Sequence, residues 1–174
     1  TGLERSAPGQ PLLSRLNLDV IRRKTTRVEG GDYDDKRDRV SLTVRFGNSD
    51  TTAAFAPMKA TIWIFGKSVT SNDLYRVLAR ESFDIPELPP RSAPFEHNTV
   101  EAVTGWDKTY ARWGERYSDW ALRVTDRAGR ELLVKTTSPT MGKSPEKLLA
   151  LQAEDYCNRS LDPRPRAKYP GSIR

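Results

Sequence analysis

Apolar and polar residues alternate along much of the chain with a period of two, which is typical of β-strands that have one buried face. The strictest alternation runs over residues 40–46, where four apolar side chains are separated by three polar ones. Residues 16–20 alternate in the same way before the polar run 22–26. Charge along a strand discourages pairing with other chains, so we expect this first strand at the edge of a sheet.

Residues 58–69 predict a central strand, because apolar side chains occur on both of its faces, with Trp63 and Phe65 opposite a row of aliphatic residues. The segment 74–85 has spacings that would also suit a helix, but its last residues before a proline favour a strand. Four prolines in residues 86–94 then interrupt regular structure. Residues 95–104 are expected to form the next strand.

The best hairpin candidate is the segment 117–137, whose alternating halves flank the turn residues 126–129. Ser144 followed by Pro145 has the cap and first-turn proline of a helix start, and leucines follow at 148, 149 and 151. About seven strands followed by one short C-terminal helix are the pattern of a mainly β protein, an immunoglobulin-like β-sandwich.

The length of 174 residues suits one domain. We expect a flexible leader over residues 1–14, a single β-sandwich over residues 15–157 and a proline-rich basic tail over residues 158–174. The sequence contains no apolar run long enough to span a bilayer as a helix. It begins with Thr rather than Met, which leads us to expect that a preceding segment, such as a signal peptide, was removed.

The net charge of +6 and the pI of about 9.6 prompt the question of a nucleic-acid partner. Five of the basic residues lie in the last 17 positions beside a single acidic one, and the expected domain is nearly neutral. A basic tail of this size is usually a solvated terminus. A nucleic-acid or membrane arm is the less favoured alternative.

Catalytic chemistry finds little support in the residues. His97 is the only histidine and Cys157 the only cysteine, which excludes multi-histidine metal centres and intramolecular disulfides. The sequence lacks a Gly-x-Ser-x-Gly elbow, and its two Gly-Lys-Ser fragments lack the preceding glycine of a phosphate-binding loop. We expect no enzyme activity and no cofactor. The acidic, glycine-rich segment 29–35 is interpreted as a solvated turn, with a calcium site as the alternative.

The most unusual feature is a series of aromatic residues spaced four and three apart: Trp106, Tyr110, Trp113, Tyr117 and Trp120. Such spacing would place them on one face of a helix, but Gly114 restricts any helix to the first half. The rings either fill the end of the core, stack on sugars, or anchor a protein interface. Trp120 is expected in the core, and Trp106 and Trp113 are expected to be exposed.

Residues 39–69, the break at 85–91 and residues 117–134 together resemble small envelope proteins of mucin-degrading gut bacteria that are encoded beside type IV pilus genes. The resemblance covers about residues 15–152 and implies an immunoglobulin-like sandwich that is exported to the periplasm or cell surface. It also implies a part in pilus assembly or host contact. That family offers no catalytic motif to match.

We therefore expect a non-enzymatic module of the cell envelope that makes protein contacts, including contacts with copies of itself. The alternative is a carbohydrate-binding module that uses Trp106, Tyr110 and Trp113. A nucleic-acid binder acting through the tail is the weakest of the three hypotheses, and a cytoplasmic location stays open.

Overall fold

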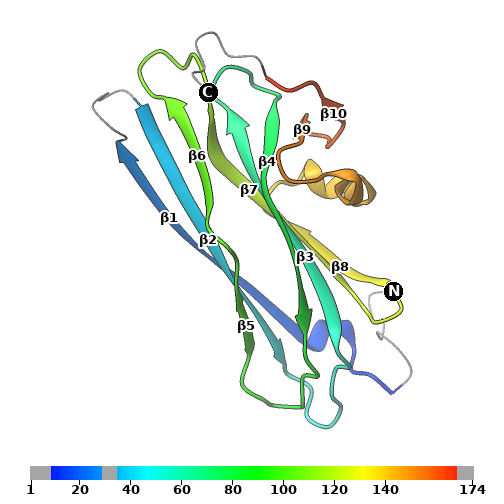
Figure 1. Cartoon of the computed structure of the whole chain (residues 1–174). Helices are drawn as coiled ribbons and strands as arrows, with labels where there is room; N and C mark the ends of the chain where they lie inside the picture. The colour runs from blue at the N-terminus through cyan, green and yellow to red at the C-terminus, as the bar shows by residue number, and fades with distance from the viewer. Residues whose placement is uncertain (1–8, 29–34, 168–174) are drawn as a thin grey trace.

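Two antiparallel β-sheets pack face to face in the computed structural model, which describes residues 9–28 and 35–167 (Figure 1). The smaller sheet has the order β1-β2-β5, with β6 also paired to β2. The larger sheet has the order β10-β9-β4-β3-β7-β8. The strands of the smaller sheet are β1 (Leu16–Val28), β2 (Asp35–Asn48), β5 (Phe95–Asn98) and β6 (Ala102–Asp107). Those of the larger sheet are β3 (Met58–Ser68), β4 (Tyr75–Ile85), β7 (Glu115–Thr125), β8 (Glu131–Thr136), β9 (Tyr156–Cys157) and β10 (Pro163–Arg164).

The connectivity is that of an immunoglobulin-like sandwich, which confirms the expected fold class. In the constant-type form of that fold the first, second, fourth and fifth strands form one sheet, while the third, sixth and seventh form the other. Here β1, β2 and β5/β6 occupy the first sheet, and β3, β7 and β8 occupy the second. β4 extends the second sheet beside β3, as an added strand does in variable-type domains.

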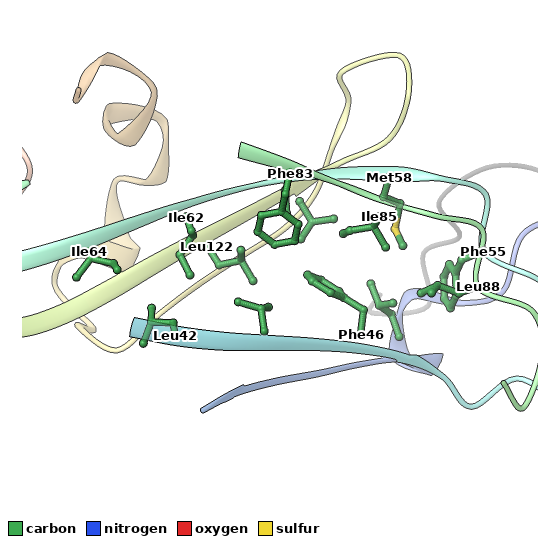
Figure 2. Packing of buried hydrophobic residues seen from close by; sticks show 14 of the residues in the cluster. Leu42, Phe46, Phe55, Met58, Ile62, Ile64, Phe83, Ile85, Leu88 and Leu122 are labelled. Atoms are coloured by element: carbon green, nitrogen blue, oxygen red, sulfur yellow. The ribbon is translucent and has the colours of Figure 1, made fainter. Parts of the chain in front are cut away.

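The main core lies between the two sheets and is built by the alternating residues of the sequence (Figure 2). The four apolar side chains of residues 40–46 are fully buried and face the larger sheet. Ile62 and Ile64 of β3 and Leu122 of β7 meet them from the opposite side. Phe55 and Leu88 close one end of this core, where their backbones form a bridge.

A second apolar cluster lies on the outer face of the larger sheet, beneath the C-terminal part of the chain. Trp63 and Phe65 project to this side of β3, opposite the aliphatic row that faces the main core. Leu148, Leu151 and Leu161 cover them. Figure 1 shows this segment, with its helical turns, β9 and β10, beside the larger sheet. β3 is therefore a central strand, as the sequence predicted, and apolar clusters cover both of its faces.

Three elements differ from expectation. The helix expected after Ser144 is formed as two 3-10 turns, η2 (Met141–Lys143) and η3 (Pro145–Ala150). A further 3-10 turn, η1 (Leu13–Arg15), precedes β1. The strand expected over residues 95–104 is divided into β5 and β6. The tail expected from residue 158 begins in packed structure, because Leu161 is 1% exposed and β10 pairs with β9. Most of the segment 29–35 lies outside the described residues.

Candidate functional site

The aromatic series lies on the connection between β6 of the smaller sheet and β7 of the larger sheet, not on a helix. We call this connection the β6–β7 hairpin because one antiparallel bridge closes it, although the two strands belong to different sheets. β6 ends at Asp107 and β7 begins at Glu115, and Trp106 bridges to Gly114 across the connection. Gly114 has a φ of +96°, and a Cβ at that position would lie 2.0 Å from the carbonyl oxygen of Gly105. Only glycine fits this close approach of the two strands. The helix that the spacing allowed in the first half is not formed, because the chain reverses here.

A buried carboxylate fixes the hairpin loop. Asp107 is 2% exposed, and its Oδ1 accepts a hydrogen bond from the backbone N–H of Tyr110 at 3.2 Å. Its Oδ2 accepts from the backbone N–H of Arg112 at 3.3 Å and from the Arg112 side chain at 3.0 Å. The hydrogen bond from the Arg112 side chain, helped by the two loop amides, lowers the pKa of Asp107 below its usual value. This one carboxylate therefore binds the loop backbone at two positions and the Arg112 side chain.

The three residues proposed as partner contacts occupy different environments. Trp106 is 4% exposed, so the expectation that it is exposed is wrong. Its indole packs under the guanidinium of Arg116, whose Cζ lies 5.0 Å from the ring centroid. Tyr110 is 67% exposed, with Arg112 stacked on it at 4.9 Å. Trp113 is half-buried, and its ring lies over Gly105.

The remaining two aromatic residues support the sandwich. Tyr117 and Trp120 are partly buried and pack against the main core. Trp120 was expected in the core, and the structure places it at the core's margin. The hairpin therefore presents Tyr110 outward from a scaffold of buried or half-buried rings.

A hollow of about 480 Å³ lies between this hairpin and the β3–β4 connection. Lys67, Lys108 and Arg116 line it, together with Trp106 and Tyr117. We call it the cationic hollow. Among the described residues, Asp107 is the only acidic one that lines it, and its carboxylate is already engaged by Arg112 and the loop amides.

A second buried carboxylate ties the two sheets together behind this hollow. Asp38 of β2 is fully buried, and its Oδ2 accepts a hydrogen bond from the backbone N–H of Tyr117 on β7 at 3.1 Å. Its Oδ1 accepts from the hydroxyl of Thr26 at 2.6 Å, and the ammonium of Lys24 lies 3.7 Å away. Sequence reasoning missed Asp38, whose only signal is a charged residue in phase with the apolar row 40–46.

His97 lies between a carboxylate and an aromatic ring of β4. Its Nε2 lies 2.9 Å from Oε1 of Glu81, and its ring stacks on Phe83 with the centroids 3.9 Å apart. His97 belongs to β5 and the other two residues to β4, so the contact joins the two sheets along one side. Oε2 of Glu81 also accepts the backbone N–H of Val100 at 3.0 Å.

Cys157 is fully buried in β9. Burial raises the pKa of its thiol to about 12, with nearby carboxylates adding to the effect. A thiol in this setting stays protonated and is a poor nucleophile at neutral pH.

Neither a metal cluster nor a membrane-crossing helix is found within residues 9–28 and 35–167. No three His, Cys, Asp or Glu side chains in these ranges lie close enough together to hold a metal ion. In the same ranges no helix combines the length and the apolar character that crossing a bilayer requires.

The chain was compared with known proteins. No protein family and no curated protein matches the sequence. A crystal structure of a protein from Akkermansia muciniphila shows a weak structural resemblance, with a TM-score of 0.35 and 13% identity over 80% of this chain and 78% of that one. An X-ray structure of a Northeast Structural Genomics Consortium target has a TM-score of 0.33 and 11% identity, over 71% of this chain and 86% of the target.

Proposed function

We propose that this chain is a non-enzymatic binding module that makes a protein contact through the tip of its β6–β7 hairpin. The observation that carries the proposal is the position of Tyr110, the most exposed large apolar side chain in the described ranges. Tyrosine and arginine are enriched among the residues that dominate binding energy at protein interfaces. Tyr110 and Arg112 stand stacked together at the loop tip.

The rigidity of the loop favours this function. A flexible loop loses conformational entropy when it binds, and that loss weakens the complex. Because Asp107 already holds the backbone at Tyr110 and Arg112 through hydrogen bonds, much of this ordering is complete before a partner arrives. Trp113 supports the loop from the side of Gly105.

A protein contact fits the hairpin better than the alternative of a sugar platform. Sugars stack on the open faces of aromatic rings. The ring of Trp106 is buried beneath Arg116, and Arg112 occupies one face of Tyr110. Trp106, Tyr110 and Trp113 therefore do not form a row of open rings.

The proposal also includes the location that the family resemblance implies. The module would act in the periplasm or at the cell surface, as part of pilus assembly or host contact, and its partner would be another protein or a second copy of the chain. Fractionation of cells that express the natural gene tests this part. Recovery from the cytoplasmic fraction alone would contradict it.

Site-specific photocrosslinking tests the contact itself. A photoreactive residue at position 110 is expected to give a discrete protein adduct in the natural host. The same residue at position 127, which is exposed in the β7–β8 turn at the opposite end of the sandwich, serves as the control. Identical adducts at both positions, or none at 110, would overturn the proposal.

Two further measurements complete this test. Sedimentation of the purified chain separates self-association from binding of another protein, and Tyr110→Ala is expected to weaken whichever contact is found by about tenfold or more.

The non-enzymatic part of the proposal predicts that His97→Ala and Cys157→Ala leave any assigned activity unchanged. Loss of a measured turnover in either variant, with the fold intact, would contradict it.

A further inference from the structure

The cationic hollow beside Tyr110 contains positive charge that no ion pair within residues 9–28 and 35–167 neutralises. Lys67 comes from β3, Lys108 from the hairpin loop and Arg116 from β7. Within the described ranges, none of these three side chains forms an ion pair with a carboxylate. Three cations from separate elements therefore surround one hollow without an ion-pair partner among the described residues.

The neighbouring acidic groups do not compensate for this charge. The carboxylate of Asp107 is bound by Arg112 and by loop amides. That of Asp38 is buried and bound by Thr26, Lys24 and the backbone of Tyr117. Both are used internally, so an anion entering the hollow meets a positive field.

One of the cations is also held in place. The guanidinium of Arg116 lies over the buried ring of Trp106, which restricts its motion. A guanidinium that stacks through its face keeps its N–H groups at the edge, where they can donate to both oxygens of a carboxylate. The polar side chains of Asn72 and Ser118 add hydrogen-bonding groups to the lining.

We propose that the cationic hollow binds an acidic segment of the protein partner, through carboxylates that pair with Lys67, Lys108 and Arg116. The inference rests on the proposed function, since it names the kind of partner that the Tyr110 contact would have. A peptide fits better than a nucleic acid, because single strands need successive open rings along a basic groove. Of the two rings that line the hollow, Trp106 is covered by Arg116 and Tyr117 by Arg22.

Fluorescence anisotropy with a labelled poly-glutamate peptide at low ionic strength tests the inference. The wild-type chain is expected to bind this peptide and not a poly-glutamine peptide of equal length. The double variant Lys67→Glu, Lys108→Glu is expected to bind about tenfold more weakly or worse, because both cations become repulsive. Lys67→Gln with Lys108→Gln gives a milder version of the test, should charge reversal disturb the fold in thermal melts.

A matched control separates the hollow from net charge. Lys59→Glu with Lys135→Glu makes the same change of charge at two exposed strand residues outside the hollow. This control is expected to weaken binding by less than about threefold, because salt screens the effect of surface charges that lie far from the bound peptide. Equal weakening by both double variants would overturn the proposal, as would absence of poly-glutamate binding.

The other probes give outcomes that contradict the inference. A single-stranded oligonucleotide that binds more tightly than poly-glutamate and depends on Lys67 and Lys108 would assign the hollow to nucleic acid. Competition by inorganic phosphate at micromolar concentration would assign it to a small anion.

The crosslinking experiment distinguishes a failure of this inference from a failure of the proposed function. Formation of the adduct at position 110 at full yield in the Lys67→Glu, Lys108→Glu variant would refute the binding of an acidic segment. That result would leave the proposed contact at Tyr110 intact. Absence of the adduct would refute the contact itself, whatever the peptide does.

Discussion

The indole nitrogen of Trp63 donates a hydrogen bond to the carbonyl oxygen of Leu151, 3.1 Å away. The same carbonyl accepts from the guanidinium of Arg80 at 3.2 Å, and that guanidinium lies 5.4 Å from the centroid of the Trp63 ring. A central strand of the larger sheet thereby fixes the C-terminal segment that covers its outer face. A Trp63 variant and a truncation of the C-terminal segment test this arrangement.

Trp63→Phe removes the indole donor and part of a fully buried ring. We expect the free energy of unfolding to fall by about 2 kcal/mol, from the lost hydrogen bond and the smaller side chain. Urea unfolding measures this. Leu149→Ala, at a neighbouring side chain that is 45% exposed, is the control and is expected to change stability by less than about 0.5 kcal/mol. Equal losses of unfolding free energy in the two variants would mean that Trp63 does not hold the C-terminal segment on the larger sheet.

A chain that ends at residue 157 is expected to melt at a lower temperature than one that ends at residue 167. The shorter chain loses buried Leu161, the pairing of β10 with β9, and the contact of Asp162 with the ammonium of Lys147 at 2.6 Å. Exposing the surface that a fully buried leucine covers costs about 2 kcal/mol or more. Equal melting temperatures would contradict this and would support the tail that the sequence predicts from residue 158.

Two glycines with positive φ form a matched pair. Gly114 and Gly129 have φ of +96° and +83°, but a Cβ on Gly114 meets backbone atoms while one on Gly129 has nothing within 4 Å. We expect Gly129→Ala to cost about 1–2 kcal/mol from the left-handed backbone alone. Gly114→Ala should cost clearly more and should disorder the β6–β7 hairpin in amide-proton NMR spectra. Similar costs for both variants would contradict the close approach of Gly105 and Gly114.

Burial of Cys157 predicts a loss of stability in alkali. The pKa of its thiol is raised from 9.0 to about 12 in the folded chain, so the folded state keeps a proton that the unfolded state releases. Its contribution to stability is therefore full below pH 9 and is lost as the pH rises from 9 towards 12, at no more than about 1.4 kcal/mol per pH unit. Urea midpoints at several pH values measure the slope.

The control for this prediction is Cys157→Ala, which should unfold with a shallower dependence on pH in the same range. Tyr156 beside it adds its own part at higher pH, because burial and the carboxylate of Glu115 raise the pKa of Tyr156 from 10.0 to about 12. An unchanged slope in the Cys157 variant would show that the thiol is accessible in the folded chain.

The sandwich could be predicted from the sequence because its signal is local. Alternation over residues 40–46 fixes which side chains face the core, and the apolar residues on both faces of 58–69 mark the central strand. The C-terminal segment that packs over Trp63 was harder to predict. It depends on leucines at 148, 151 and 161, which lie in 3-10 turns and loops without a regular period.

The candidate site was less predictable, because its contacts join residues that are distant in sequence or lie in an irregular loop. The four-and-three spacing of the aromatic residues imitates a helix, and only the close approach of Gly114 to Gly105 shows why the chain turns instead. Burial of Trp106 depends on the strand pairing that sets it opposite Lys36. Asp38 is bound by the backbone of Tyr117, 79 positions away, and no local pattern encodes that contact.

Asp107 provides the last prediction, because one carboxylate fixes the loop that carries Tyr110. Asp107→Asn keeps the size of the side chain but removes the charge that Arg112 binds, and one carboxylate oxygen becomes an NH2 group that cannot accept a hydrogen bond. We expect faster hydrogen exchange at the amides of Tyr110 and Arg112 in NMR spectra, with the melting temperature of the sandwich nearly unchanged. Asp126→Asn is the control, since Asp126 binds the amides of Ala128 and Arg130 in the β7–β8 turn and should leave the hairpin loop unaffected.

The same loop has a defined response to acid. Because its pKa is lowered from the usual 3.8 in the folded chain, Asp107 stabilises the folded loop at every pH above that value and loses this effect as the pH falls through its lowered pKa. Protection of the Tyr110 and Arg112 amides, corrected for intrinsic exchange, should therefore be constant from neutral pH down to about 4 and decrease only below it. In Asp107→Asn the protection should be low and independent of pH over the whole range. Loss of wild-type protection already near pH 6 would show that another group holds the loop. The argument that Asp107 orders the loop around Tyr110 before a partner binds would then be wrong.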